Sequence, residues 1–452
     1  MREILIASCP PVGHISPLLN VAAGLVARGD RVTVLTSARH ADKIRAVGAE
    51  PHPLPHGADY DDATLDADLP GRAATSGIAR INFDVDHVFV RPLPHQFSAL
   101  QGLLAQRRYD AVLSDAFFLG TLPMLLDDRR ARPPIVAYTT TPLLLTSVDT
   151  PPGGPGLAPM AGVLGRIRNR VLTQITQRLL LRPAQRAADR MLTAMGLPTL
   201  PVFALDCAVL ADRVIVPTVP AFEYHRSDLP AHIRFVGAVH PLPSADFVVP
   251  PWWGVLDSGR PVVHVTQGTV DNADLTRLIE PTVDALADED VTLVVTTGGR
   301  PVSQIRRPLP ANTVVAEYLP HDVLLPKVDV MVTNGGYGAV QRALSVGVPL
   351  VVAGTTEDKP EVAARVEHFG AGVNLRTGTP TAVQVRRAVR EVLSNPRHTD
   401  GARRLQRAYA GRDSMAAISA VLDEAIAEAT RESTKGRRSE DATTLSALSL
   451  KT

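Results

Sequence analysis

The chain alternates short apolar runs with stretches whose apolar residues recur every three or four positions. An apolar run at 4–8 is followed by helical spacing through Leu18, Leu25 and Val26, and a second run covers 31–36. Short apolar runs bounded by turn residues are typical of buried strands, and spacing of three and four is typical of helices. Strand, helix and strand in such quick succession predict a parallel sheet with helices on both faces.

The same alternation restarts in the second half of the chain. Proline-rich sequence at 217–261 contains one predicted strand, 233–236, and precedes a new strand series. That series predicts strands at 262–266, 291–297, 313–316, 329–333 and 349–353, then helices at 380–393 and 414–429. We therefore predict an N-terminal Rossmann-like domain at 1–225, a linker at 226–260, a C-terminal Rossmann-like domain at 261–412, a C-terminal helix at 413–430 and a disordered tail at 431–452.

Composition and charge exclude several classes of protein. The 47 basic and 46 acidic residues leave a net charge of +1, so no global field gathers nucleic acid. Cys9 and Cys207 are too few for a disulfide framework or a zinc site, which fits a reducing compartment. The N-terminus begins directly with a strand, no apolar run reaches 18 residues, and only five lysines occur. We expect a soluble, cytoplasmic protein from a GC-rich bacterial genome.

A glycine-rich bend at 334–338 follows the predicted strand 329–333 and opens a short helix. Glycines let the backbone approach an anion, and a helix N-terminus aims free N–H groups at the same point. Glu357 and Asp358 follow the next strand, where a carboxylate can bind a hydroxyl. A dinucleotide site is the alternative, but Gln341 occupies the position of a fingerprint glycine or alanine and the motif lies deep in the chain.

Two residues at predicted strand ends are candidates for acid–base chemistry. His14 lies in the loop after the first strand, and Asp115 follows the strand 109–114. If these loops meet, the carboxylate can fix the imidazole tautomer and make His14 a general base. The alternatives are a loop histidine bonded to backbone and a helix N-cap aspartate.

Other charged and apolar stretches have plainer interpretations. Paired aspartates at 59–62, 66–68 and 84–86 could hold a divalent metal, but none closes a predicted strand, and a solvated acidic loop is favoured. The region 138–165 suits the lining of an apolar pocket or a plain loop. Seven arginines at 166–190 follow a helical pattern with Asp189 as the only acid; a solvated face is favoured over contact with anionic lipid.

Together these pieces resemble one family. In their order along the chain they are similar to nucleotide-sugar-dependent glycosyltransferases of the GT-B fold, within the UDP-glycosyltransferase superfamily, in the group with natural-product and macrolide glycosyltransferases. The resemblance covers roughly residues 1–430, and its specificity lies in the ordered set of short motifs. It implies two Rossmann-like α/β domains facing across a cleft, with a C-terminal helix packing back.

The resemblance implies roles residue by residue. Gly13-His14-Ile15-Ser16-Pro17 resembles the family's acceptor-side opening, whose histidine is the catalytic base, and Asp115 resembles the acid that pairs with it. The family's phosphate loop, base-stacking element, signature helix and sugar-binding pair correspond to these donor-side positions: Thr266, Gly268 and Thr269; Tyr318, Leu319 and His321; Asn334, Gly335, Gly336, Tyr337, Gly338 and Arg342; Glu357, Asp358 and Lys359.

Four positions depart from the family pattern. Asn334 replaces a diphosphate-binding histidine, and Tyr318 replaces a stacking tryptophan. Arg342 replaces a ribose-binding glutamate, which favours a thymidine-type donor or an arginine placed on phosphate. Lys359 replaces a sugar-binding glutamine, which permits an acidic or modified sugar.

The implied activity is an inverting, metal-independent transfer of a sugar from a dTDP- or UDP-linked donor to a hydroxyl of an apolar small molecule such as a polyketide or glycolipid. No cofactor is implied beyond the donor co-substrate, and the expected partners are donor and acceptor. Peripheral membrane contact and either a monomer or a homodimer stay open. The rival hypotheses are a nucleotide-sugar epimerase or hydrolase and a donor-binding protein without transfer.

Overall fold

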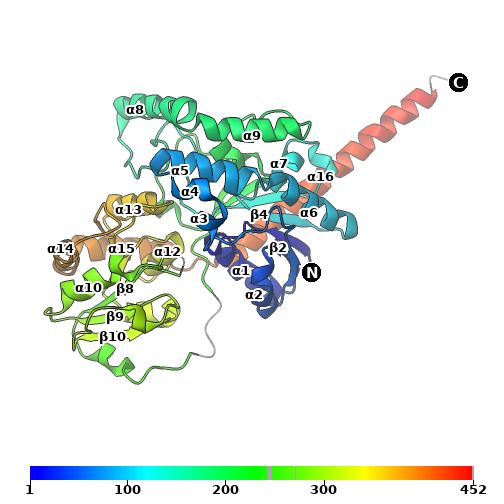
Figure 1. Ribbon diagram of the computed structural model, residues 1–452. Coiled ribbons are helices and arrows are strands. Elements are labelled where there is room, and N and C mark those ends of the chain that lie inside the picture. The colour runs from blue at the N-terminus through cyan, green and yellow to red at the C-terminus, as the bar shows by residue number, and fades with distance from the viewer. Residues whose placement is uncertain (242–246, 270, 450–452) are drawn as a thin grey trace.

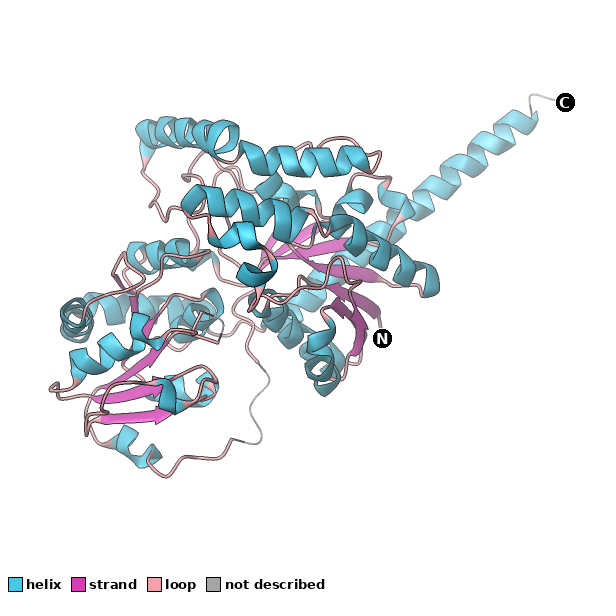
Figure 2. Cartoon of the chain, in the orientation of Figure 1, coloured by secondary structure: helices cyan, strands magenta, loops and turns pink. Residues whose placement is uncertain are grey.

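Two parallel sheets, one in each half of the chain, organise the protein (Figure 2). The computed structural model describes residues 1–241, 247–269 and 271–449. The first sheet has seven strands in the order β3-β2-β1-β4-β5-β6-β7, and the second has six in the order β10-β9-β8-β11-β12-β13. All neighbouring strands pair in parallel. The predicted α/β class with two Rossmann-like domains is confirmed.

The strands are short and mostly buried, as expected for sheets covered on both faces. Those of the first sheet are β1 (Glu3–Ala7), β2 (Arg31–Thr36), β3 (Glu50–Pro53), β4 (Ala111–Asp115), β5 (Ile135–Tyr138), β6 (Arg213–Val216) and β7 (Ile233–Phe235). Those of the second are β8 (Val262–Thr266), β9 (Thr292–Thr296), β10 (Thr313–Ala316), β11 (Val330–Thr333), β12 (Leu350–Val352) and β13 (Gly372–Asn374).

Helices connect and cover the strands (Figure 1). In the first half they are α1 (Val12–Ala27), α2 (Ala41–Ala46), α3 (Leu65–Asp68), α4 (Pro70–Ala73), α5 (Gly77–Asp84), α6 (Leu93–Gln106), α7 (Leu122–Leu125), α8 (Gly162–Ile175) and α9 (Arg182–Ala194), with π-helical turns η2 (Val85–Val90) and η5 (Thr176–Leu180). In the second half they are α10 (Ile279–Leu286), α11 (His321–Leu324), α12 (Tyr337–Ser345), α13 (Lys359–His368), α14 (Ala382–Ser394), α15 (Pro396–Tyr409) and α16 (Ser414–Ser449).

The C-terminal helix returns to the first half. Ile418, Val421, Leu422 and Ala425 of α16 share a buried core with α1 and the strands β1, β4 and β5. This packing confirms the C-terminal helix that the resemblance implied. The helix continues to Ser449, whereas the sequence predicted disorder from 431; the segment contains no proline and only one glycine, Gly436, so it has no strong helix breaker. The last three residues of the predicted tail lie outside the described residues.

Three further differences separate prediction from structure. His14 lies inside the first turn of α1 rather than in a loop, because the helix starts directly after Pro10 and Pro11. The region 50–99, which has no clear period, forms short helices whose acids pair with arginines. The strand β7 pairs with β6, so the first sheet extends into the predicted linker.

Side chains and backbone groups from both halves meet between the sheets. The backbone N–H groups of Gly154 and Gly156 each donate to Glu361 Oε1 at 2.9 Å. Thr218 Oγ1 donates to Gln341 Oε1 at 3.1 Å. These bonds join α12 and α13 of the second half to loops of the first half. In the described residues, no helix combines the length and apolar character needed to cross a membrane.

Candidate active site between the two halves

The site residues lie where the strand order reverses in each sheet. In the first sheet β1 and β4 are neighbours although β2 and β3 separate them in sequence, and β8 and β11 are neighbours in the second. Ligands of open parallel sheets bind at the carboxyl ends of strands at such a reversal. His14 follows β1 and Asp115 ends β4, while Gly268 follows β8 and Asn334 follows β11.

His14 and Asp115 form a hydrogen-bonded pair. The distance between His14 Nδ1 and Asp115 Oδ2 is 2.8 Å, and Thr140 Oγ1 lies 3.4 Å from the same nitrogen. Asp115 is held in turn by the backbone N–H groups of Cys9 and Phe117, at 3.3 and 3.1 Å. Because the carboxylate accepts the Nδ1 proton, Nε2 of His14 is the nitrogen with a free lone pair.

Charge and burial set the proton affinities of this pair. Burial works to lower the pKa of His14, but the Asp115 carboxylate, aided by Asp358 and Glu357, raises it above its ordinary value. Burial works to raise the pKa of Asp115, but the imidazole and its backbone donors hold it below its ordinary value. Asp115 therefore stays ionised and stabilises a protonated His14.

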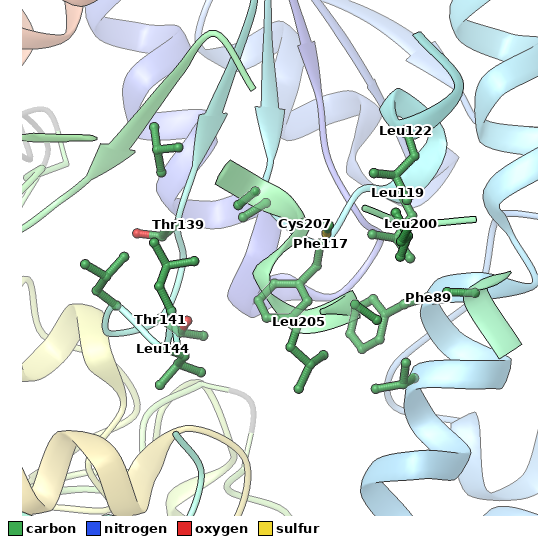
Figure 3. A pocket seen from close by; sticks show the side chains of 18 of the residues that line it. Phe89, Phe117, Leu119, Leu122, Thr139, Thr141, Leu144, Leu200, Leu205 and Cys207 are labelled. Atoms are coloured by element: carbon green, nitrogen blue, oxygen red, sulfur yellow. The ribbon is translucent and has the colours of Figure 1, made fainter. Parts of the chain in front are cut away.

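An apolar cavity adjoins this histidine. The His14 ring centroid lies 5.9 Å from that of Phe89 and 5.5 Å from that of Phe117. Figure 3 shows the Phe89 and Phe117 rings together in the cavity, which measures about 820 Å³ including its solvent-filled part. Most of the other lining groups are aliphatic, among them Leu119, Leu122, Leu144, Leu200 and Leu205. Such a lining fits an apolar ligand, and two of its aromatic rings lie beside the imidazole of His14.

The glycine-rich bend and the loop after β8 are pinned together. Asn334 Nδ2 donates to the Gln267 carbonyl at 2.6 Å, and Asn334 Oδ1 accepts from the Gly336 N–H at 3.4 Å. The amide that replaces the family's histidine is therefore bonded to the loops themselves. Gly268 and Gly336 both lie beside the Asn334 amide oxygen, so the structure brings together the two loops of the predicted phosphate site.

The backbone of this bend depends on glycine. Gly335 has φ of +89°, and a Cβ there would lie 2.8 Å from Val352 Cγ1. The bend leads into α12, whose N-cap residue is Gly336. Because glycine has no side chain, no N-cap side chain accepts hydrogen bonds from the first amides of the helix. The amides of Tyr337 and Gly338 thus point from a helix N-terminus, where an anion is favoured.

A second group of donor-side residues lies near the start of α11. Burial lowers the pKa of Arg342, although Tyr318 and Asp322 act in the opposite direction. Burial also lowers the pKa of His321, and Arg342 adds to the effect. Tyr318 is 63% exposed, so its ring is free to stack on a base. Tyr318 lies just before α11, His321 begins α11, and Arg342 lies on α12, which packs against α11.

The carboxylate and amine of the predicted sugar-binding pair have different surroundings. Burial raises the pKa of Asp358 to about 6, against the effect of Lys359. Lys359 is buried, and its Nζ lies 2.9 Å from Thr356 Oγ1, 3.3 Å from Asp271 Oδ2 and within bonding distance of Glu357. Its ammonium is thus already paired within the protein, which does not favour the acidic sugar that its presence suggested.

Some of the predicted donor-binding residues have buried side chains, so they can contact a donor only through their backbone or shape the loops around it. Leu319 and Tyr337 have side chains buried in the core of the second half, and only their backbones can meet a donor. The Thr266 hydroxyl is buried and accepts from the Gly268 N–H at 3.1 Å, which shapes the loop. Gly13 and Thr269 face open space.

One group of potential metal ligands lies at the site. Cys9, His14 and Asp115 place ligand atoms within 4.8 Å of one another. Burial, with the Asp115 charge, raises the pKa of Cys9 well above its ordinary value, so its thiol is protonated beside the His14–Asp115 pair. The acidic pairs of the first half are bound to arginines instead, at Arg39, Arg72 and Arg80.

Several residues near the site have no distinctive sequence pattern. Phe89 lies in a region without apolar period, and Asp271 is an acid in a loop like many others. Asn272 Nδ2 donates to the carbonyls of Gly268, Thr297 and Gly298, each at 3.0 Å, and so fixes the phosphate loop against the next strand. The only sequence signal for this role of Asn272 is its position near a glycine-rich loop, and asparagines are common at such positions.

Comparison with known proteins identifies the family. Over 415 residues the chain is 42% identical to 4'-demethylrebeccamycin synthase of Lentzea aerocolonigenes, covering 91% of this chain and 97% of that protein. The chain belongs to the natural-product glycosyltransferases of the UDP-glycosyltransferase superfamily. It is also 34% identical to UDP-glucosyltransferase A1 of Starmerella bombicola, covering 94% of this chain and 92% of that protein.

Two further comparisons agree with this family. Residues 280–424 of the glycosyltransferase match the family described as erythromycin biosynthesis protein CIII-like, C-terminal domain. The crystal structure of the glycotransferase of kitacinnamycin superposes with a TM-score of 0.68 at 24% identity, covering 94% of this chain and 98% of that one. The enzyme is thus a GT-B glycosyltransferase that transfers a sugar to a natural-product acceptor.

Proposed function

We propose that the enzyme inverts the anomeric centre in one displacement, with His14 as the base. Nε2 takes the proton of the acceptor hydroxyl as its oxygen attacks the anomeric carbon, and the bond to the diphosphate breaks on the opposite face. Asp115 stabilises the imidazolium that forms. The observation that carries this proposal is the 2.8 Å pair of His14 and Asp115, whose imidazole packs beside two rings, Phe89 and Phe117, that line an apolar cavity.

The diphosphate leaving group would lie at the N-terminus of α12. Its growing negative charge is stabilised by the amides of Tyr337 and Gly338 and by the loop at Gly268 and Thr269. The role of Asp358 is to accept a hydrogen bond from a sugar hydroxyl. No step requires a metal, since backbone amides and a helix dipole supply the electrostatic stabilisation.

The nucleoside would be held by the group around Tyr318. Tyr318 stacks on the base, and Arg342 occupies the position from which the family binds the ribose hydroxyls. An arginine offers no acceptor to a 2′-hydroxyl, which favours a thymidine donor over a uridine donor. Calorimetric titration with thymidine and uridine diphosphates tests this; tighter binding of the uridine compound contradicts it.

The acceptor would be an apolar, hydroxylated natural product encountered in the cytoplasm. Transfer is tested by incubating the enzyme with dTDP-glucose or UDP-glucose and a panel of hydroxylated aromatic compounds. Product that forms only when both substrates are present supports transfer. Turnover of donor without acceptor supports a hydrolase or epimerase, and tight donor binding without turnover supports a binding protein.

A further inference from the structure

The helix α8 presents its apolar side to solvent. Its buried side is small and polar, formed by Gly165, Asn169 and Thr173. Its outer side, with the adjoining turn η5, carries large apolar residues that we call the α8 face: Val163 (74% exposed), Leu164 (74%), Ile167 (55%), Val171 (52%), Ile175 (42%) and Leu179 (70%). This arrangement is the reverse of an ordinary surface helix.

Polar contacts fix α8 in this orientation. Asn169 Nδ2 donates to the Val148 carbonyl at 3.2 Å, and Gln177 Nε2 donates to Thr146 Oγ1 at 2.7 Å. At Gly165 a Cβ would lie 1.8 Å from the Met160 carbonyl oxygen, so no larger residue fits the inner side. Turning the apolar residues inward would break these bonds. The inner contacts of α8 therefore keep the α8 face exposed to solvent.

The charge beside the α8 face is strongly positive. Between residues 162 and 190 the chain has seven arginines and one acid, Asp189, although its whole net charge is +1. Asp189 is occupied as an acceptor for Gln185 Nε2 and the Leu200 N–H. Within the described residues, only Arg166 of these arginines forms a salt bridge, with Asp149 at 2.9 Å. Arg166 and Arg170 follow one flank of the apolar stripe by helical spacing.

We propose that the α8 face docks on an anionic lipid bilayer. A helix with an apolar stripe and basic flanks lies in the membrane interface, where apolar side chains enter the acyl boundary and guanidinium groups bind phosphates. From Val163 to Leu179 the stripe extends about 24 Å at ~1.5 Å per residue. In Figure 1, α8 and α9 lie end to end along the outer edge of the first half, so a flat surface can reach both.

The position of α8 links docking to the acceptor cavity. The loop that receives its hydrogen bonds, at Thr146 and Val148, continues directly from residues 141–145, which line the cavity. Val148 is itself 48% exposed and extends the apolar surface. Docking would therefore hold the acceptor cavity close to lipid, where apolar acceptors concentrate. The positive flanks favour a lipid headgroup over the apolar groove of a protein partner.

The test is sedimentation of the full chain with lipid vesicles. We expect binding to vesicles of phosphatidylcholine with 30% phosphatidylglycerol, and weaker binding to pure phosphatidylcholine. The double variant Leu164→Gln/Leu179→Gln should reduce the partition coefficient tenfold or more. Arg170→Gln and Arg178→Gln should each reduce it about fivefold on anionic vesicles only.

Matched controls lie on the second half of the enzyme. Val383 is 75% exposed on α14, and Arg397 is exposed on α15. Val383→Gln and Arg397→Gln should leave vesicle binding unchanged, and all variants should keep the thermal midpoint of the parent. Failure of the folded parent to bind anionic vesicles overturns the proposal. A stable dimer in light scattering that Leu164→Gln/Leu179→Gln dissociates also overturns it, because a second copy then covers the face.

Discussion

Arg365 on α13 donates to Glu223 of the first half through Nη2 at 3.0 Å, with both side chains buried. The same Nη2 also donates to the Leu143 carbonyl at 3.2 Å, and Nη1 donates to Glu361 Oε2 at 2.9 Å. Leu143 lines the acceptor cavity. One guanidinium therefore connects the donor half to the wall of the acceptor site.

Loss of this guanidinium should destabilise the enzyme. Arg365→Met removes the guanidinium from two buried carboxylates, and Arg226 remains beside only one of them, Glu223, so the change costs about 3–5 kcal/mol in the free energy of unfolding. Urea denaturation measures the change. Arg390→Met is the matched control, because that arginine pairs with Glu289 while 65% exposed and should change stability by ~1 kcal/mol or less. Equal effects of the two substitutions would contradict a buried junction.

The pair of His14 and Asp115 predicts a defined pH dependence. A general base must be neutral, so the rate should fall as pH decreases through the pKa of His14, which Asp115 raises. Asp115→Asn removes the negative charge, so the acid limb of the kcat profile should move to lower pH while kcat at its plateau falls roughly a hundredfold or more. An acid limb that moves to higher pH, or does not move, would show that Asp115 does not act on the base.

Asp358 should link donor use to pH. Burial raises its pKa to about 6, so protonation below that pH removes the charged acceptor for a sugar hydroxyl. We expect KM for the donor to rise as pH falls through about 6, and Asp358→Asn to show a high KM without this dependence. A raised pKa means that the folded protein holds this proton more tightly than the unfolded chain does. The free energy of unfolding of the parent should therefore decrease as pH rises from 3.8 to about 6. Parallel profiles for parent and variant would argue against Asp358 as the titrating group.

Much of the fold follows from local pattern. The strands at 31–36, 262–266 and 313–316 match the predicted ranges, since buried parallel strands are continuous apolar runs. The pairing of His14 with Asp115 also follows, because the carboxyl ends of parallel strands meet at one edge. The strands β5 and β6 were not predicted, because each is only four residues long and lies next to prolines or arginines. Such a run is too short to show a hydrophobic periodicity.

The tertiary contacts of charged residues could not be predicted. No local pattern indicates that Glu223 and Arg365 are buried, because their contact joins residues 142 positions apart and forms only where the two halves meet. Lys359 is a similar case, because its partner Asp271 comes from a loop of another strand. The acidic pairs near 59–86 form salt bridges with arginines on neighbouring short helices. These helices could not be predicted because the apolar residues there are irregularly spaced.

The central claim is that His14 acts on the acceptor and not on the donor. The direct test is His14→Ala, measured for sugar transfer by product chromatography and for donor nucleotide binding by calorimetry on the same preparation. We expect transfer to fall by about 10²–10⁴-fold or more while the Kd for the nucleoside diphosphate changes less than threefold. Transfer within tenfold of the parent would contradict it.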